Sequence, residues 1–205
     1  MKTYTMDQGS EEWFLARRGK PTASNFRRII TAVGQKPSAG MDAYIDQLLG
    51  DEMAIHYPYR VESYTNRAMQ WGQETEAEAR RWYQMETGME VRKVGGITTD
   101  DDRFWASPDG LVGTDGGLEL KCPTPAVHMS YVRRKACPPS YLAQVHGGLV
   151  VGLGTLSWWH FLSYCPGLPP VLIRVVPDDF TKKLSECLEI FWAKYLAAKD
   201  VVKSL

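Results

Sequence analysis

Two acidic residues and a lysine lie in two neighbouring segments whose composition is typical of short β-strands. Asp109 stands in the sequence SPDG, and Glu119 and Lys121 stand in the sequence LELK. The turn sequence TDGG at 114–117 separates these segments, which predicts a β-hairpin and brings Asp109 close to Glu119. Because side chains alternate along a strand, Glu119 and Lys121 share one face, whereas Leu120 points into the core. We therefore expect two carboxylates and one ammonium group to converge.

This combination suits the hydrolysis of a phosphodiester bond. Two carboxylates can hold Mg²⁺ while leaving coordination positions for water and a phosphate oxygen, and the carbonyl of Leu120 is a further oxygen ligand. The metal lowers the pKa of its bound water, and a lysine stabilises the charge that grows on the phosphate. The arrangement resembles that of the PD-(D/E)XK nucleases. Because the pattern is short, the alternative stays open that Asp109 and Gly110 form an ordinary turn and that Glu119 and Lys121 form a surface ion pair.

The surrounding pattern predicts an α/β fold in which helices flank a mixed sheet. Ser10 can cap the first helix, and two acids follow it at the positive N-terminal end. Apolar residues at three- and four-residue spacings predict that the longest helix begins near Ser63 and ends near Thr87. The order of the elements excludes a repeat protein and a helical bundle. Helices are predicted over 10–18, 41–55, 63–87, 139–151 and 178–199 and from about Thr22 and Thr124, and strands over 89–98, 104–112, 117–121, 155–164 and 170–176.

The composition is that of one globular domain spanning residues 1–205. Hydrophobic residues make up 44% and charged residues 23% of the 205 residues, and the chain is long enough for one substantial core. The four cysteines have no zinc-binding spacing, so we expect reduced thiols. The N-terminus does not resemble a signal peptide, and the apolar stretch 147–156 is too short to span a bilayer. We therefore expect a cytoplasmic protein.

Charge is distributed unevenly along the chain, although its total is zero. The sequence holds 24 basic and 24 acidic residues, a balance that is less common in DNA-binding proteins than a basic one. Residues 1–40 carry seven lysines and arginines against three acids, and the stretch 122–140 carries Arg133, Arg134 and Lys135 with no acid. A neutral chain can therefore present a basic face that binds phosphate. Scattered, solvated charges are the alternative.

Four sequence motifs in matching order resemble the phage-type alkaline exonucleases, the family of phage lambda exonuclease that is also called YqaJ-like viral recombinases. The motifs are QGSEEWFLARRGKPTAS near the N-terminus, AMQWGQETEAEAR in the longest predicted helix, ASPDGLVG with GLELKCP at the hairpin, and SYLAQVHGGLVV in a later helix. The resemblance extends over roughly residues 8–165. The segment 34–62 and the residues after Tyr164 show little match, so the resemblance implies least about them.

The resemblance implies roles for four residues in and beside the predicted hairpin. Asp109, Glu119 and the carbonyl of Leu120 would bind metal, and Lys121 would be the catalytic lysine. Glu76, in the longest predicted helix, would lie near a second metal ion; the alternative is a solvated acid on the helix surface. The implied cofactor is Mg²⁺, which Mn²⁺ can replace, with two ions in each active site.

The resemblance also implies a pocket for a terminal 5′-phosphate. Arg17 and Ser24 match this pocket, and an arginine fork with a hydroxyl near a helix N-terminus suits an anion. Gln144 would lie near the scissile phosphate and its metals. Tyr141 would be structural or would line the active site, and we expect Trp13 to pack in the core rather than to contact DNA.

By resemblance, the fold is restriction-endonuclease-like and the protein is a DNA exonuclease. It would digest one strand of linear double-stranded DNA from 5′ to 3′, release mononucleotides and leave a 3′ overhang for recombination. The implied partners are a single-strand annealing protein and further copies of the chain, which would form a homotrimeric ring around DNA. The resemblance further implies a phage or prophage protein that acts in the cytoplasm of a bacterial host.

Three other functions remain open at this point. A PD-(D/E)XK endonuclease has no use for a pocket that binds a DNA end, so Arg17 and Ser24 argue against it. A CRISPR-associated relative with an iron–sulfur cluster would need clustered cysteines, which the sequence lacks. A non-catalytic DNA-end-binding or recombination scaffold would not need the complete set of acids and lysine.

Overall fold

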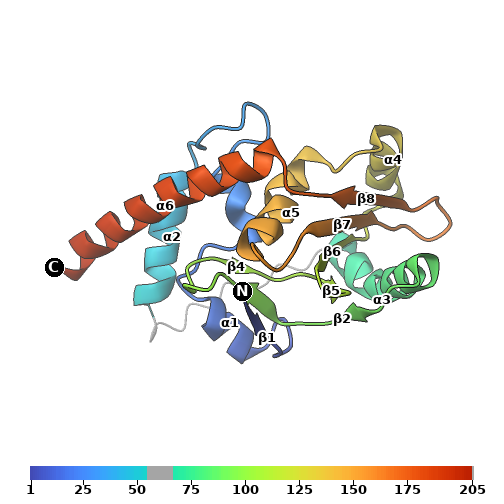
Figure 1. The fold of residues 1–205 in the computed structure, drawn as a ribbon, viewed down its shortest axis with the longest axis horizontal. Coiled ribbons are helices and arrows are strands. Elements are labelled where there is room, and N and C mark those ends of the chain that lie inside the picture. The colour runs from blue at the N-terminus through green and yellow to red at the C-terminus, as the bar shows by residue number, and fades with distance from the viewer. Residues whose placement is uncertain (55–66, 205) are drawn as a thin grey trace.

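The computed structural model describes the backbone of residues 1–54 and 67–204. Within these residues the elements follow the predicted order, preceded by a short strand at the N-terminus (Figure 1). The predicted start of the longest helix at Ser63 lies outside the described residues. None of the described helices is both long and apolar enough to cross a membrane. The helices are α1 (Glu11–Arg17), η1 (Ala23–Arg28), α2 (Met41–Met53), α3 (Arg67–Thr87), α4 (Pro125–Arg134), α5 (Pro139–Val151) and α6 (Asp179–Lys203), and the strands are β1 (Lys2–Tyr4), β2 (Val91–Arg92), β3 (Gly96–Thr98), β4 (Trp105–Ala106), β5 (Gly110–Val112), β6 (Gly116–Lys121), β7 (Trp158–Ser163) and β8 (Val171–Val175).

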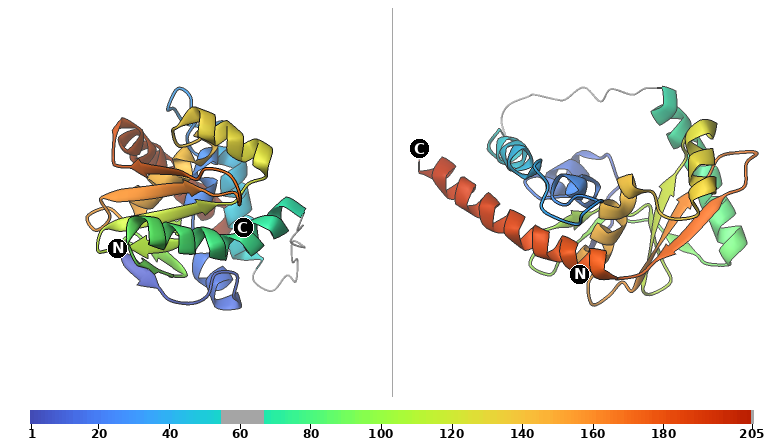
Figure 2. Two further views of the ribbon diagram at one scale, coloured as in Figure 1. Left: turned by 90° about the vertical axis from the view of Figure 1, so that its right-hand side faces the viewer. Right: turned by 90° about the horizontal axis from the view of Figure 1, so that it is seen from above.

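A five-stranded sheet in the order β2-β5-β6-β7-β8 forms the centre of the fold. Its neighbouring strands are antiparallel except for β6 and β7, which run parallel. A smaller sheet has the order β1-β3-β4. Helix α5 packs on one face of the large sheet and α3 packs on the other (Figure 1 and Figure 2). The predicted α/β fold with a mixed sheet between helices is therefore confirmed.

Two segments predicted as single strands each divide between the two sheets. The segment 89–98 forms β2 and β3, and the segment 104–112 forms β4 and β5. Pro108 separates β4 from β5, and a proline has no backbone N–H to donate to a strand ladder. The two predictions were wrong about continuity, because the composition of a strand does not reveal which neighbour each part of it will pair with.

The predicted hairpin joins β5 to β6 and places Val112 opposite Gly116. Gly113 makes the turn, and its φ of 56° is a left-handed conformation that glycine adopts without strain. Gly116 and Gly117 lie inside β6 rather than in the turn. A Cβ at Gly117 would overlap the ring of Trp159 on β7, so this position of the strand requires glycine. The glycines that signalled the turn therefore also allow β7 to pack its tryptophans against β6.

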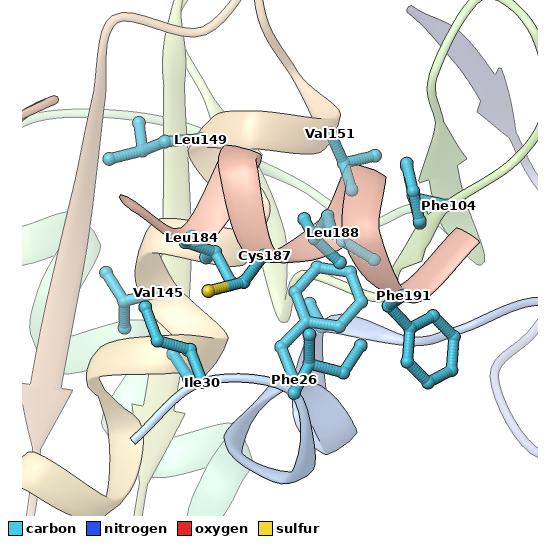
Figure 3. Close-up of a cluster of buried hydrophobic side chains, with 14 of the residues drawn as sticks. Phe26, Ile30, Phe104, Val145, Leu149, Val151, Leu184, Cys187, Leu188 and Phe191 are labelled. Carbon is cyan, nitrogen blue, oxygen red and sulfur yellow. The ribbon is translucent and has the colours of Figure 1, made fainter. Parts of the chain in front are cut away.

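The largest hydrophobic core lies between α5, α6, η1 and the large sheet (Figure 3). Phe26 of η1 and Phe191 of α6 are completely buried there, and Cys187 lies among the same side chains. A second cluster fills the opposite face of the sheet under α3 and contains Leu120, as its position in the strand predicts. All four cysteines are free thiols.

Local sequence signals define the ends of several helices. Ser10 Oγ accepts a hydrogen bond from a backbone N–H of the first turn of α1, as predicted. Helix α6 begins with a capping box of Asp178 and Thr181, and Nδ1 of His146 on α5 lies 2.8 Å from Oγ1 of Thr181. The helix predicted from Thr22 is a 3₁₀-helix of six residues. Its tighter geometry places Phe26 under α5, in the core.

A pair of glycine-to-alanine substitutions tests how closely α5 approaches the sheet. Gly148 of α5 lies against Trp159, whose ring a Cβ would overlap, whereas Gly50 of α2 has open space around it. We expect Gly148→Ala to lower the free energy of unfolding by about 1–3 kcal/mol through overpacking. Gly50→Ala, the control, should raise it by about 0.5–1 kcal/mol because alanine favours a helix. Urea unfolding of both variants measures the difference, and equal effects would contradict the close packing.

Candidate active site

A cavity of about 230 Å³ lies where α1, η1, the β5–β6 hairpin and α5 meet. Its walls combine residues from the first 24 positions of the chain with residues more than 80 positions later. Six of the residues that the sequence singles out line it together: Arg17, Ser24, Asp109, Glu119, Lys121 and Gln144. The structure therefore brings the predicted hairpin residues and the predicted phosphate-binding residues into one site.

The hairpin register holds the Asp109 carboxylate against β6. The backbone N–H of Asp109 donates to the carbonyl of Leu118 at 2.9 Å, and the N–H of Leu120 donates to Oδ2 of Asp109 at 2.5 Å. Asp109 is thus fixed at both its backbone and its side chain. Glu119, on the cavity face of β6, is only 2% exposed. Asp109 is half-buried, and the two carboxylates lie together in the wall of the cavity, as the predicted pairing requires.

An ammonium group and an amide group contact the same oxygen of Glu119. Nζ of Lys121 lies 2.5 Å from Oε1, and Nε2 of Gln144 on α5 donates to Oε1 at 2.7 Å. The ring of Tyr141 lies beside Lys121, with its centroid 5.3 Å from Nζ. Tyr141 does not line the cavity; it packs against Phe161. Tyr141 therefore packs in the fold and also borders the active site through Lys121, so both predicted roles stay open.

The electrostatics of the site leave a negative charge that is only partly balanced. Burial, followed by the charge of Glu119, raises the pKa of Asp109 to about 7. Burial lowers the pKa of Lys121, but Glu119 and Asp109 outweigh it, so the pKa of the ammonium is raised and the group stays charged. Two acidic groups with one ammonium beside them form a site that a bound cation would stabilise.

The donor atoms of this site fit Mg²⁺. Asp109 and Glu119 supply the hard oxygen ligands that Mg²⁺ prefers, and this ion commonly binds through one or two carboxylates and retains waters. Across residues 1–54 and 67–204, no three acidic, cysteine or histidine side chains gather closely enough to hold a metal ion. Glu76 on α3 forms an ion pair with Arg80, with Oε1 2.5 Å from Nη2. Its charge contributes to the raised pKa of Asp109.

Arg17 and Ser24 line the same cavity as the carboxylates. Cζ of Arg17 lies 4.0 Å from the ring centroid of Trp13, and burial lowers the pKa of the guanidinium. No carboxylate among the described residues lies within 4.0 Å of Arg17. Ser24 is exposed, and its Oγ lies 3.3 Å from Oγ1 of Thr22, whose backbone N–H donates to the Tyr44 hydroxyl. This part of the cavity can therefore accept an anion from solvent.

Several residues of the site were not predicted, or were predicted elsewhere. Trp13 is partly buried and lines the cavity, so its expected place in the core was wrong. Gln8 and Ser107 also line the cavity, and Trp159 closes it from β7. Gln8 and Trp13 belong to the first motif and Ser107 to the SPDG motif, which was the available signal. Trp159 carried none, because aromatic residues in strands are usually core residues.

The comparisons with known proteins point to one family. The YqaJ-like viral recombinase domain matches residues 12–154. An alkaline exonuclease from Laribacter hongkongensis, LHK-Exo, is 31% identical, with a TM-score of 0.74 over 95% of this chain and 99% of that chain. The structure of LHK-Exo in complex with dAMP matches with the same values. No curated protein sequence matches the chain significantly.

A more distant structure agrees in fold. A phage related exonuclease from Haemophilus somnus 129PT has a TM-score of 0.62 and 13% identity, covering 88% of this chain and 96% of that chain. The domain match spans more than half of the sequence and contains Arg17, Ser24, Asp109, Glu119 and Gln144. The chain therefore belongs to the YqaJ-like viral recombinase family.

Proposed function

We propose that this protein is a Mg²⁺-dependent exonuclease that digests one strand of linear double-stranded DNA from 5′ to 3′. The observation that carries the proposal is a cavity lined both by a pair of carboxylates with a lysine and by an arginine with a serine. The first group suits phosphodiester hydrolysis and the second suits a terminal phosphate. The products would be mononucleotides and a 3′ overhang.

The similar proteins support this reading. LHK-Exo is described as an alkaline exonuclease, and its structure has been solved with dAMP. A deoxynucleoside monophosphate is the product expected when an exonuclease removes one nucleotide at a time. The cavity of the present chain contains the groups that such a product would need, because the carboxylates and a guanidinium all line it.

The hairpin residues would divide the chemistry among them. Asp109, Glu119 and the carbonyl of Leu120 would hold Mg²⁺, which when bound lowers the pKa of water and offsets charge on the phosphate. Gln144 would keep Glu119 in place through its hydrogen bond to Oε1. Lys121, charged and beside the carboxylates, would stabilise the pentacovalent phosphate or help to orient the attacking water.

The remaining parts of the proposal rest on family membership. Glu76 would contribute to a second metal ion after its pairing with Arg80 is exchanged, and Mn²⁺ would replace Mg²⁺. Three copies of the chain would surround DNA in a ring, and a single-strand annealing protein would receive the 3′ overhang. The protein would act in the cytoplasm of a bacterial host as a phage or prophage product.

Digestion of linear and closed circular DNA tests the proposed activity. We expect Mg²⁺-dependent release of mononucleotides from linear duplexes with 5′-phosphates, no release in EDTA, and an intact circle. The physical reason is that Arg17 and Ser24 need a free end to contact. Cutting of the circle would instead establish an endonuclease, and the absence of cleavage on every substrate would favour a DNA-end-binding scaffold.

Two substitutions separate metal binding from the chemistry. Asp109→Asn should abolish both cleavage and the rise in thermal stability that Mg²⁺ produces in the wild type, which is worth about 2.7 kcal/mol at a hundred times the dissociation constant. Lys121→Met should abolish cleavage but keep the stabilisation, because it leaves both carboxylates. Calorimetry with and without Mg²⁺ measures the second effect. Cleavage by Lys121→Met at the wild-type rate would remove the lysine from the mechanism.

The phosphate pocket predicts a preference that depends on Arg17. Arg17→Ala should reduce kcat/KM on 5′-phosphorylated ends far more than on 5′-hydroxyl ends, by a cost of about 1.5–3 kcal/mol for charge-assisted hydrogen bonds. Arg18→Ala is the matched control, because Arg18 is exposed and does not line the cavity. Steady-state kinetics on the two duplexes give the ratio. An equal loss on both ends would show that Arg17 does not recognise the phosphate.

A further inference from the structure

Arg17 belongs to α1, a helix with no residue buried in the hydrophobic core. Its guanidinium lies against the indole of Trp13, four residues earlier on α1, with Cζ 4.0 Å from the ring centroid. Helix α1 has seven residues and buries none of them. A helix this short is not stable by itself. Contacts from outside the helix must therefore fix the place of Arg17 over the cavity.

The indole N–H of Trp13 makes such contacts. Its Nε1 donates to the carbonyl of Gly95 at 2.8 Å and to Oγ of Ser107 at 3.1 Å. The same Oγ accepts a hydrogen bond from Nε1 of Trp105 at 2.7 Å, which holds Ser107 in place. Ser107 stands two residues before Asp109. Trp13 therefore connects the arginine to the segment that carries the first carboxylate.

Gln8 links the same two segments a second time. Its Nε2 donates to the carbonyl of Pro108 at 2.8 Å and to the carbonyl of Val94 at 3.1 Å. Pro108 is the residue directly before Asp109. The N-terminal segment is thus attached to the carboxylate segment by side-chain hydrogen bonds on both sides of the start of α1.

We propose that Trp13 is a positioning residue, which fixes Arg17 relative to the Asp109–Glu119 pair. The inference rests on the proposed function, in which Arg17 binds the terminal 5′-phosphate. An arginine side chain has many rotamers. Stacking on the face of an indole restricts these rotamers and leaves the N–H groups of the guanidinium free to bind phosphate. Because less order is then lost on binding, the restricted arginine binds the phosphate more tightly.

The position of Arg17 relative to the carboxylates also matters for the reaction. A phosphate held by Arg17 places the next phosphodiester bond at the carboxylates only if the distance between them is constant. The hydrogen bonds of Trp13 to Gly95 and Ser107 keep the distance from Arg17 to the carboxylates constant, because they join α1 to the segments beside Asp109. Loss of Trp13 would therefore act on phosphorylated ends through Arg17, and not on the carboxylates directly.

Kinetics on 5′-phosphorylated and 5′-hydroxyl duplexes test this role through the ratio of their kcat/KM values. Trp13→Leu removes the ring and the N–H, and we expect the ratio to fall about tenfold, mainly through KM for phosphorylated ends. Trp13→Phe keeps an aromatic face but has no N–H donor, so its ratio should lie between those of the wild type and Trp13→Leu. In an Arg17→Ala background, Trp13→Leu should not change the ratio further, because the residue through which it acts is absent.

The matched control is Trp82→Leu. Trp82 of α3 is also partly buried, but it packs near Tyr164 and does not line the cavity. The control should lose packing as Trp13→Leu does and yet keep the wild-type ratio. Thermal unfolding of each variant defines an assay temperature at which all are folded. If Trp13→Leu does not fold, Trp13→Phe with and without Arg17→Ala provides the same comparison.

The outcomes separate this inference from the function on which it rests. A wild-type ratio in Trp13→Leu, an equal fall in Trp82→Leu, or a further fall in the Arg17→Ala background would overturn the role of Trp13 while leaving the phosphate pocket intact. If the wild type itself does not distinguish the two ends, the pocket fails and the inference fails with it. A tenfold fall that depends on Arg17 supports both.

Discussion

Asp109 and Glu119 carry two carboxylates that repel each other, and this repulsion constrains everything around them. Burial and the charge of Glu119 together raise the pKa of Asp109 to about 7. Such a pair is stable only where hydrogen bonds and opposite charge compensate for lost solvation. The N–H of Leu120, the ammonium of Lys121 and the amide of Gln144 provide this compensation. The hairpin register and the position of α5 must therefore both be correct for the site to exist.

Close packing of strands and helices brings these groups together. The ring of Trp159 on β7 fits against Gly117 of β6 and Gly148 of α5, where any larger residue would overlap it. This contact allows α5 to pack closely on the sheet. Gln144 of α5 can then donate to Glu119, which lies on the same face of β6 as Gly117. The opposite face of β6 packs under α3. One strand therefore serves the core on one side and the site on the other.

Hydrogen bonds rather than burial hold the other half of the site. Helix α1 buries no residue, and its attachment to the hairpin depends on Gln8 and Trp13. The family match over residues 12–154 contains every cavity-lining residue except Gln8 and Trp159. Helix α6 lies outside this match, although Phe191 and its neighbours complete the largest core (Figure 3). The family match therefore covers almost all of the residues that line the cavity, but it omits a helix that completes the largest core.

Local sequence signals are enough to predict the hairpin with Asp109, Glu119 and Lys121, the buried Leu120 and the capped start of α1, because turns, alternation and caps are local. Motif order, through family resemblance, also indicated Arg17, Ser24 and Gln144. Which elements meet is known only from the tertiary fold. It divided two predicted strands between sheets, turned Glu76 toward Arg80 and placed Trp13 in the cavity wall. Local patterns record which face of an element is apolar, but not which distant element will lie opposite it.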